Sequence, residues 1–169
     1  NKWVYLGIKT GAGYLLADHL GSARAFLNSF VKNSTFCGCN ISFDLMHLYK
    51  DPMIKDVLQE KPIWDIQLAE YILSGQQTKF ASLDELSVQY GLPVKDNDIK
   101  KYFEAGLGAD KIPKEEILPY LQQDCSNTLE IAWKQYARAI EQNQLPLIKS
   151  QMKALHCTTE MMFNGLHID

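Results

Sequence analysis

The chain has 169 residues, enough for one domain with a buried core, and its 46% hydrophobic and 22% charged residues are ordinary for a globular protein. The net charge of −3 argues against a protein that coats nucleic acid through bulk positive charge. It leaves room for an enzyme that holds phosphates through bound divalent metal, because such a site needs clustered carboxylates. No apolar run approaches the roughly 20 residues needed to span a bilayer, and no N-terminal segment resembles a signal peptide.

The N-terminal segment predicts a β-hairpin followed by a helix. Residues 2–9 are rich in strand formers, Thr10-Gly11-Ala12-Gly13 makes a turn, and residues 14–16 return as a strand. Ser22 is the predicted N-cap of the helix that follows, and Ala25 is among the side chains expected to face inward.

The stretch from Gly38 to Asp44 places a carboxylate where a strand passes into a helix. It follows the apolar run Thr35-Phe36-Cys37 and leads into residues 45–49, which have helical spacing of apolar residues. Polar groups at such a crevice are well placed to meet a ligand. Asp44 is therefore a candidate functional carboxylate, and the order of elements up to this point predicts a mixed α/β sheet.

The rest of the chain is predicted to be mainly helical. A short strand ends at Asp65, which can cap the next helix, and Ser82 begins another helix with capping-box spacing. Residues 93–112 read as a mobile surface loop with a short helical piece, and such loops often touch substrate. A long helix is expected to restart at Pro119, and a last helix covers residues 147–163.

Tyr120 and Asp124 are four positions apart, so on a helix the phenol and the carboxylate share one face. Short motifs match freely, and the alternative is a core or boundary tyrosine beside a solvated aspartate. Structural roles are predicted for several other side chains: a boundary position for His47, a helix cap for Asp84, and core positions for Trp64 and Trp133. The four cysteines, Cys37, Cys39, Cys125 and Cys157, are predicted to be reduced thiols, and a metal or disulfide role for them is the alternative.

The motifs together resemble a known family. Asn40-x-x-Phe43-Asp44 is followed by W-D-I-Q-L-A-E-Y-I-L-S-G and S-L-D-E-L, and Tyr120-x-x-x-Asp124 ends 80 positions after Asp44 (124 − 44). This order resembles the DnaQ-like (DEDD) 3′→5′ exonucleases, and more closely the proofreading domain of family A DNA polymerases, the polymerase I-like enzymes of bacteria and phages. Tyr120, rather than histidine, is similar to the DEDDy branch. Residues 160–169 are similar to the passage from exonuclease to polymerase domain, the alternative being a helix closed by an Asn-Gly turn.

The resemblance implies a fold, an activity and a site. The fold is a ribonuclease H-like mixed α/β sheet flanked by helices, with residues 1–143 as the exonuclease domain and 144–169 as a helix leading into a polymerase domain. The activity is removal of 3′-terminal nucleotides from single-stranded DNA with two Mg²⁺ or Mn²⁺ ions. Asp44 and Asp124 are implied as catalytic metal ligands, and Tyr120 as the residue that orients the attacking water. Asn40 and Phe43 are implied to bind the terminal nucleotide, although Asn40 could instead satisfy backbone groups at the junction.

The implied partners are a single-stranded DNA 3′ end and the polymerase domain of the same polypeptide. The protein is expected to be a monomer without a membrane part, in the cytoplasm of a bacterial cell or a phage-infected host.

The family's first motif, Asp-x-Glu on the first strand, has no counterpart here, since no acidic residue occurs before Asp18. One explanation is that residues 2–16 match the second and third strands, with the first strand upstream. The other is that Leu6-Gly7-Ile8-Lys9 is the first motif, with Gly7 and Lys9 replacing the acids of an inactive enzyme. The hairpin pattern favours the upstream strand, and in either case these residues are predicted to bind metal poorly.

Two alternative functions stay open from the sequence. One is a catalytically inactive exonuclease-like domain that braces a polymerase or binds DNA. The other is an RNase D-like 3′→5′ ribonuclease, which shares the fold and the tyrosine motif, although the polymerase-like C-terminal segment speaks against it.

Overall fold

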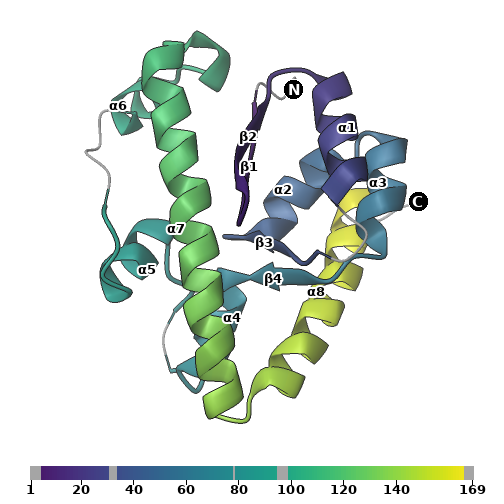
Figure 1. Cartoon of the computed structure of the whole chain (residues 1–169), viewed down its shortest axis with the longest axis vertical. Helices are drawn as coiled ribbons and strands as arrows, with labels where there is room; N and C mark the ends of the chain where they lie inside the picture. The colour runs from purple at the N-terminus through teal and green to yellow at the C-terminus, as the bar shows by residue number, and fades with distance from the viewer. Residues whose placement is uncertain (1–4, 31–33, 78, 95–98, 166–169) are drawn as a thin grey trace.

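The computed structural model describes residues 5–30, 34–77, 79–94 and 99–165. These residues form a mostly helical α/β domain with two small sheets, which confirms the predicted mixed α/β class (Figure 1). The elements follow in the order β1 (Leu6–Thr10), β2 (Gly13–Ala17), α1 (Leu20–Phe30), β3 (Phe36–Gly38), α2 (Ile41–Leu48), α3 (Pro52–Gln59), β4 (Ile63–Asp65), α4 (Ile66–Leu73), α5 (Leu83–Gln89), α6 (Lys100–Glu104), the 3₁₀ turn η2 (Ala109–Lys111), α7 (Lys114–Glu141) and α8 (Leu145–Asn164).

The predicted N-terminal hairpin is confirmed from Leu6 onward, while residues 2–4 of the predicted strand lie outside the described part. β1 and β2 are antiparallel, with Leu6 opposite Ala17 and Thr10 opposite Gly13. The Thr10 hydroxyl fixes the turn, because it donates to the Gly13 carbonyl (3.3 Å) and accepts from the Ala12 N–H (3.2 Å). Gly13 has φ 151°, a backbone angle that suits glycine.

Helix α1 begins earlier than predicted, and Ser22 is not its N-cap. The His19 carbonyl accepts from the Ala23 N–H (3.2 Å), and the His19 ring Nδ1 accepts from the Ser22 N–H (3.2 Å), so the first turn closes on His19. The face directed to the core carries Ala23 and Leu27, four positions apart, whereas Ala25 is exposed. The prediction that Ala25 faces inward is therefore wrong, because a different face of the helix is directed to the core.

Strands β3 and β4 are parallel, and each passes directly into a helix, β3 into α2 and β4 into α4. The Asp65 side chain is hydrogen-bonded at both strand-to-helix junctions. Its Oδ1 accepts from the N–H groups of Gln67 (2.8 Å) and Leu68 (3.0 Å) in α4, as predicted for a cap, and its Oδ2 accepts from the Ile41 N–H (2.7 Å) at the start of α2. Asn40 occupies the N-cap position of α2 with a left-handed backbone (φ 55°) and makes no side-chain cap bond. One buried carboxylate thus caps two helices.

The passage from β3 to α2 requires a glycine at position 38. A Cβ built there lies 2.8 Å from Ile41 Cγ1 and 2.9 Å from Ile41 Cβ, closer than carbon atoms pack. Gly38→Ala is expected to lower the free energy of unfolding by about 1–3 kcal/mol, the usual penalty for overpacking a core. Gly11→Ala is the matched control, because nothing lies within 4 Å of that added Cβ. Urea denaturation of the two variants measures the difference, and equal stabilities would contradict the packing argument.

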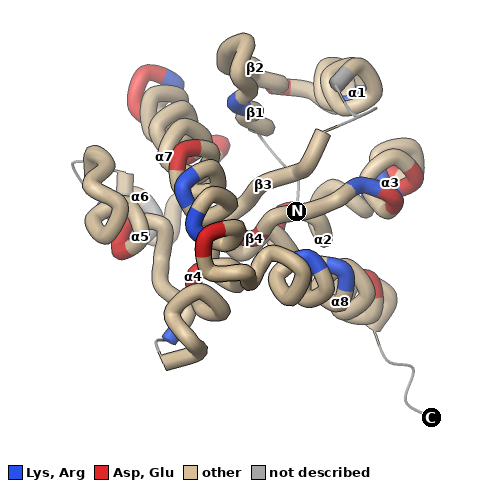
Figure 2. The backbone as a smooth tube through the Cα atoms, turned by 60° about the horizontal axis from the view of Figure 1, so that its bottom comes forward, with Lys and Arg blue, Asp and Glu red and all other residues tan. Residues whose placement is uncertain are grey.

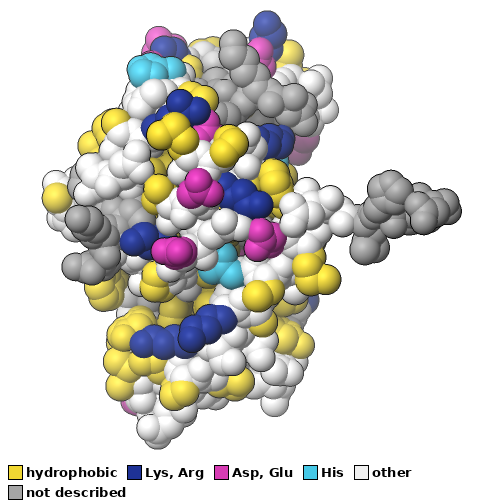
Figure 3. All heavy atoms as spheres, turned by 90° about the vertical axis from the view of Figure 1, so that its right-hand side faces the viewer, with side chains coloured by type: hydrophobic (Ala, Val, Ile, Leu, Met, Phe, Trp, Pro, Cys, Tyr) yellow, Lys and Arg dark blue, Asp and Glu magenta, His cyan; other side chains and the backbone are white. Residues whose placement is uncertain are grey.

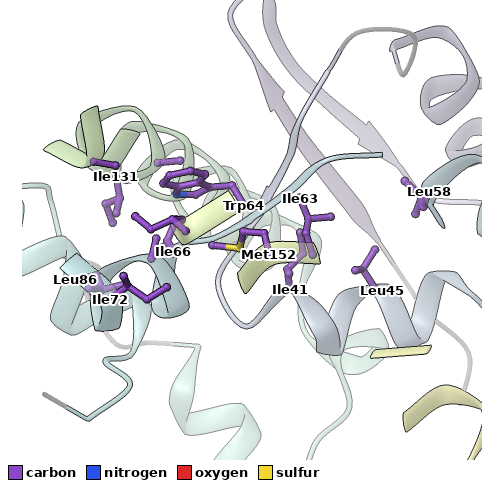
Figure 4. Packing of buried hydrophobic residues seen from close by; sticks show 14 of the residues in the cluster. Ile41, Leu45, Leu58, Ile63, Trp64, Ile66, Ile72, Leu86, Ile131 and Met152 are labelled. Atoms are coloured by element: carbon purple, nitrogen blue, oxygen red, sulfur yellow. The ribbon is translucent and has the colours of Figure 1, made fainter. Parts of the chain in front are cut away.

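The main core takes side chains from α1, α2, α3, β4, α4, α5, α7 and α8, and Figure 4 shows part of it. Trp64 from β4 is 4% exposed, as predicted, and donates its indole N–H to Gln135 Oε1 (3.1 Å). Trp133 is 66% exposed on α7, so its predicted core position is wrong. The two tryptophans differ because Trp133 lies two residues from Gln135 on the helix and therefore on the opposite side.

A buried polar network ties three helices together behind the sheet. Glu70 of α4 is 4% exposed and accepts from Tyr90 Oη (2.5 Å), Gln135 Nε2 (3.1 Å) and an Arg138 guanidinium nitrogen (2.9 Å). Every bond to the carboxylate comes from another helix or its end, so the network fixes α7 against α4 and α5.

Helix caps further along the chain agree only in part with the sequence. Ser82 forms the predicted capping box with Glu85 at the start of α5, whereas Asp84 lies in the first turn and is not the cap. Pro119 does not restart a helix, because α7 runs without a break through it from Lys114. A second, smaller cluster around Ile99, Ile112 and Ile117 anchors the α6–η2 segment to the beginning of α7.

Helix α8 packs back onto the core, against α2 and β4. Ile148, Met152 and Thr159 are buried, and the Thr159 and Ser42 hydroxyls are hydrogen-bonded at 2.8 Å. The division of the chain after residue 143 stays a prediction.

Candidate functional site

A cleft of about 560 Å³ opens between the hairpin, β3 and α7. Its walls are mainly apolar and include Ile8 of β1, Phe26 of α1 and Leu121 of α7. The ionisable side chains of its lining include Lys9, Asp44, His47 and Asp124, and Thr10, Ser34, Thr35 and Thr128 add hydroxyl groups. A largely apolar cavity with a few convergent polar groups is typical of a binding site.

The two aspartates identified from the sequence line this same cleft. Asp44 lies in the first turn of α2, and Asp124 lies on α7, 80 positions later in the chain (124 − 44). The fold brings them to one cavity because α2 begins directly after β3, and α7 passes beside β3 (Figure 1). The sequence alone could not show that proximity.

The surroundings of Asp44 hold its carboxyl in a partly desolvated position, although the residue as a whole is exposed. Burial raises the pKa of Asp44 to about 6; the nearby His47 opposes the rise and the Asp65 carboxylate adds to it. His47 shares a hydrogen bond with the Phe43 carbonyl (2.9 Å), and its ring lies 4.5 Å from the Phe43 ring. Phe43 is 56% exposed at the cleft. Perturbed carboxyl groups in a cleft are common at functional sites.

Asp44→Asn is expected to stabilise the protein near neutral pH. Because the folded pKa of about 6 lies above the ordinary value near 3.9, this group's contribution to stability is present in acid and is lost as the pH rises through 6. Near pH 7 the free energy of unfolding of the variant should exceed that of the wild type by about 1 kcal/mol, because solvent screens part of the effect, and near pH 4 the two should be equal. Urea denaturation with EDTA at both pH values measures the gain. Asp110→Asn, on the exposed η2 turn, is the control, and a wild type as stable as the variant near pH 7 would contradict the prediction.

Asn40 and Tyr120 do not line the cleft. Tyr120 lies on α7 one turn before Asp124, which agrees with the predicted shared helix face, and it packs against the cluster around Ile99, Ile112 and Ile117. Asn40 is exposed at the β3–α2 junction. The capping bond that Asn40 could have made to the backbone comes from Asp65 instead, so the backbone-satisfying alternative for Asn40 loses its main support.

Cys37 and Cys39, which border the cleft, are protonated thiols at neutral pH. Burial raises the pKa of Cys37 to about 11. Burial, with the charges of Asp65, Asp44 and Asp84, raises the pKa of Cys39 to about 12. Because the thiolate is the form that binds metal or attacks a substrate, these positions are poor candidates for either role.

The carboxylate oxygens of Asp44 and Asp124 suit hard cations such as Mg²⁺ and Mn²⁺. Within the described part of the chain, however, no three His, Cys, Asp or Glu residues gather in a way that could hold a metal ion. Mg²⁺ is usually held by one or two carboxylates, with waters and substrate oxygens in the other positions, so Asp44 and Asp124 supply at most one carboxylate to each of two ions. The described residues therefore fit part of a metal site and not a complete one.

Lys9, named from the sequence only as a replaced acid of the inactive-enzyme alternative, lines the cleft. Alternation along β1 puts Lys9 and Gly7 on one face of the strand. Gly7 packs directly on α7, since a Cβ there would lie 2.8 Å from Leu121 Cγ and 3.1 Å from Cys125 Sγ. The local signal for Lys9 is this alternation, which places it on the same face of β1 as Gly7, the face that packs toward α7. His47, assigned to a boundary position, also lines the cleft.

Charge over the rest of the molecule is mixed in sign. Basic and acidic positions both occur along α7, and they also occur together on α3 and α8 (Figure 2). The face that carries α3 and α8 shows the same mixture, with apolar side chains between (Figure 3). These views agree with the net charge of −3 and give no support to nucleic-acid binding by bulk positive charge.

A mixed α/β domain with aspartates at a cleft beside its sheet is an arrangement typical of metal-dependent enzymes that hydrolyse phosphodiesters. The chain belongs to the 3′-5′ exonuclease family, whose model matches residues 2–135. The family implies a ribonuclease H-like fold, a nucleic-acid substrate and divalent metal ions. No significant match was found among curated proteins or solved structures. None of the described helices is both long and apolar enough to cross a membrane.

Proposed function

We propose that this chain is the proofreading 3′→5′ exonuclease domain of a DNA polymerase, which removes 3′-terminal nucleotides from single-stranded DNA. One observation carries the proposal: Asp44 and Asp124 line one cleft in a chain of the 3′-5′ exonuclease family. The polymerase domain would belong to the same polypeptide, and residues 144–169 would lead into it.

Each candidate residue has a proposed role. Asp44 and Asp124 hold divalent ions, which when bound supply an activated water and stabilise charge on the scissile phosphate. Tyr120 orients the attacking water from the same face of α7 as Asp124. The exposed ring of Phe43 offers an apolar contact for the terminal base, and Asn40 supplies a hydrogen bond from the junction beside it.

Two observations favour an additional strand over a lost first motif. β1 pairs with β2, and within the described residues it does not pair with β3, as a first strand beside β3 would. Gly7 also has no room for a side chain, since an added Cβ would lie 2.6 Å from Tyr14 Oη and 2.8 Å from Leu121 Cγ. An ancestral acid at position 7 would need a different packing of α7. Leu6–Thr10 therefore fits a hairpin strand better than a degenerate Asp-x-Glu strand.

The test is degradation of 5′-labelled oligonucleotides by the protein that contains this sequence, with Mg²⁺ or Mn²⁺. We expect single-stranded DNA to shorten stepwise from its 3′ end, and EDTA to stop the reaction because carboxylates alone supply no nucleophile. Binding of DNA without shortening would support the inactive, DNA-binding alternative. Faster shortening of an RNA of the same sequence would support the RNase D-like alternative.

A further inference from the structure

One exposed ring of the cleft has a neighbour that fixes its position. Phe43 is 56% exposed in the first turn of α2, and a ring so open to solvent exchanges rotamers unless another group holds it. His47 follows four positions later, so on the helix it lies on the same side of α2 as Phe43. Ile41 and Leu45 are buried on the opposite side of α2, which turns both rings away from the core.

Two contacts connect the His47 side chain to Phe43. The ring centroids lie 4.5 Å apart with the planes tilted by 45°, which is the spacing of attractive ring pairs. The His47 Nδ1 lies 2.9 Å from the Phe43 carbonyl oxygen, and because a carbonyl only accepts, Nδ1 carries the proton of this bond. A proton on Nδ1 is compatible with the neutral ring and with the charged ring, so the bond orients the imidazole in both states.

Both rings border the cleft that holds the two aspartates. Phe43, Asp44 and His47 all line it, and they belong to two successive turns of one helix. The His47 charge reaches the Asp44 carboxyl, whose pKa it lowers against the effect of burial. Among the described residues, no other pair of contacting rings has both members in the lining of this cleft. The ring pair thus lies beside the carboxylate that is proposed to hold a metal ion.

We infer that His47 is a positioning residue for Phe43, holding the Phe43 ring in the orientation in which it contacts the 3′-terminal base of the bound strand. The inference rests on the proposed function, in which Asp44 holds a metal ion at the scissile phosphate and Phe43 contacts the base. A ring that is fixed before binding loses less side-chain freedom when the nucleotide arrives, so the complex is tighter. His47 therefore acts through Phe43 on substrate binding, and the chemical step belongs to the carboxylates and their ions.

A double-mutant cycle tests whether His47 acts through Phe43. The probe is single-stranded DNA with 2-aminopurine at its 3′ end, whose fluorescence reports binding at pH 8 with Ca²⁺ in place of Mg²⁺. We expect Phe43→Ala to weaken binding about tenfold, as loss of one base–aromatic contact does. His47→Ala should weaken it about three- to tenfold, the range that corresponds to ordering one side chain. The double variant should bind like Phe43→Ala alone, because without that ring His47 has nothing to position.

Two replacements of His47 separate the ring contact from the hydrogen bond and the charge. His47→Phe keeps a ring against Phe43 and should bind the probe within about twofold of the wild type. His47→Asn keeps a donor for the Phe43 carbonyl without the ring, and should bind as weakly as His47→Ala. Both replacements remove the imidazole charge from beside Asp44, so a change in the pKa of Asp44 affects them equally. His19→Ala, which removes an exposed histidine outside the cleft, should leave binding unchanged.

Additive losses in the double variant, or binding restored by His47→Asn and not by His47→Phe, would overturn the inference. Unchanged binding by folded His47→Ala, with folding judged by circular dichroism, would also overturn it. In degradation with Mg²⁺, His47→Ala should raise KM and leave kcat within about twofold. A wild type that binds the DNA without degrading it would overturn the proposed nuclease function, and the binding cycle would still decide the role of His47. A wild type that does not bind the 3′ end would overturn both.

Discussion

Asp124→Asn is expected to reduce 3′→5′ degradation of single-stranded DNA at least about 1,000-fold, because loss of a metal ligand removes several kcal/mol of transition-state stabilisation. The amide keeps the size of the side chain and loses its charge, so the fold is expected to survive. Initial rates on a 5′-labelled oligonucleotide, with Mg²⁺ and then Mn²⁺, measure the effect. Asp44→Asn should show a loss of similar size, since Asp44 faces the same cleft.

The control for Asp124 is Asp110→Asn, which neutralises an exposed carboxylate on the η2 turn. That variant should retain the wild-type rate. Tyr120→Phe should fall between the two, with a loss of about 10–100-fold, because it removes a positioning hydroxyl and no metal ligand. Full activity in Asp124→Asn would remove this residue from the proposed site while leaving the family assignment intact.

Asp65→Ala is expected to lower the free energy of unfolding by roughly 3–5 kcal/mol, a large part of the 5–15 kcal/mol typical of a domain. The carboxylate is 4% exposed and accepts from three backbone N–H groups, those of Ile41, Gln67 and Leu68. Alanine leaves these donors without their acceptor at the ends of two parallel strands. The loss should also disturb the position of Asp44, which lies one turn into α2.

Chemical denaturation followed by circular dichroism measures the effect of Asp65→Ala. Asp65→Asn retains one carbonyl acceptor and should lose about half as much stability. Asp110→Ala, an exposed carboxylate, should change stability by no more than about 0.5 kcal/mol. A small effect of Asp65→Ala would mean that water replaces the carboxylate at both helix ends.

Features encoded within a few residues could be predicted from the sequence. The Thr10–Gly13 turn and the Ser82 capping box depend on neighbouring side chains, and both occur as predicted. The positions of Asp44 and Asp124 on separate helices followed from local apolar spacing. Their order along the chain, together with the motifs between them, was enough to identify the family that the comparison confirmed.

Features that depend on distant contacts could not be predicted. Trp133 has the same local pattern as a core residue, and only the placement of Gln135 toward Trp64 turns it outward. The capping of α2 comes from Asp65, 24 positions away, so nothing near Asn40 reveals it. The first turn of α1 closes on the ring of His19, and histidine is not among the residues usually preferred as helix N-caps.

Because α8 packs onto α2, the core around α2 can be completed during synthesis only after α8 has been made. The Ser42–Thr159 hydroxyl pair joins residues 117 positions apart, and Met152 Sδ accepts from the Asp65 N–H at 3.2 Å. Until the ribosome has released α8, the apolar sides of α2 and β4 stay uncovered. At translation rates of about 5–20 residues per second, that interval lasts roughly 6–25 seconds, long enough for chaperones to bind the nascent chain. Removal of α8 should therefore reduce the soluble yield of the protein more than its distance from the cleft suggests.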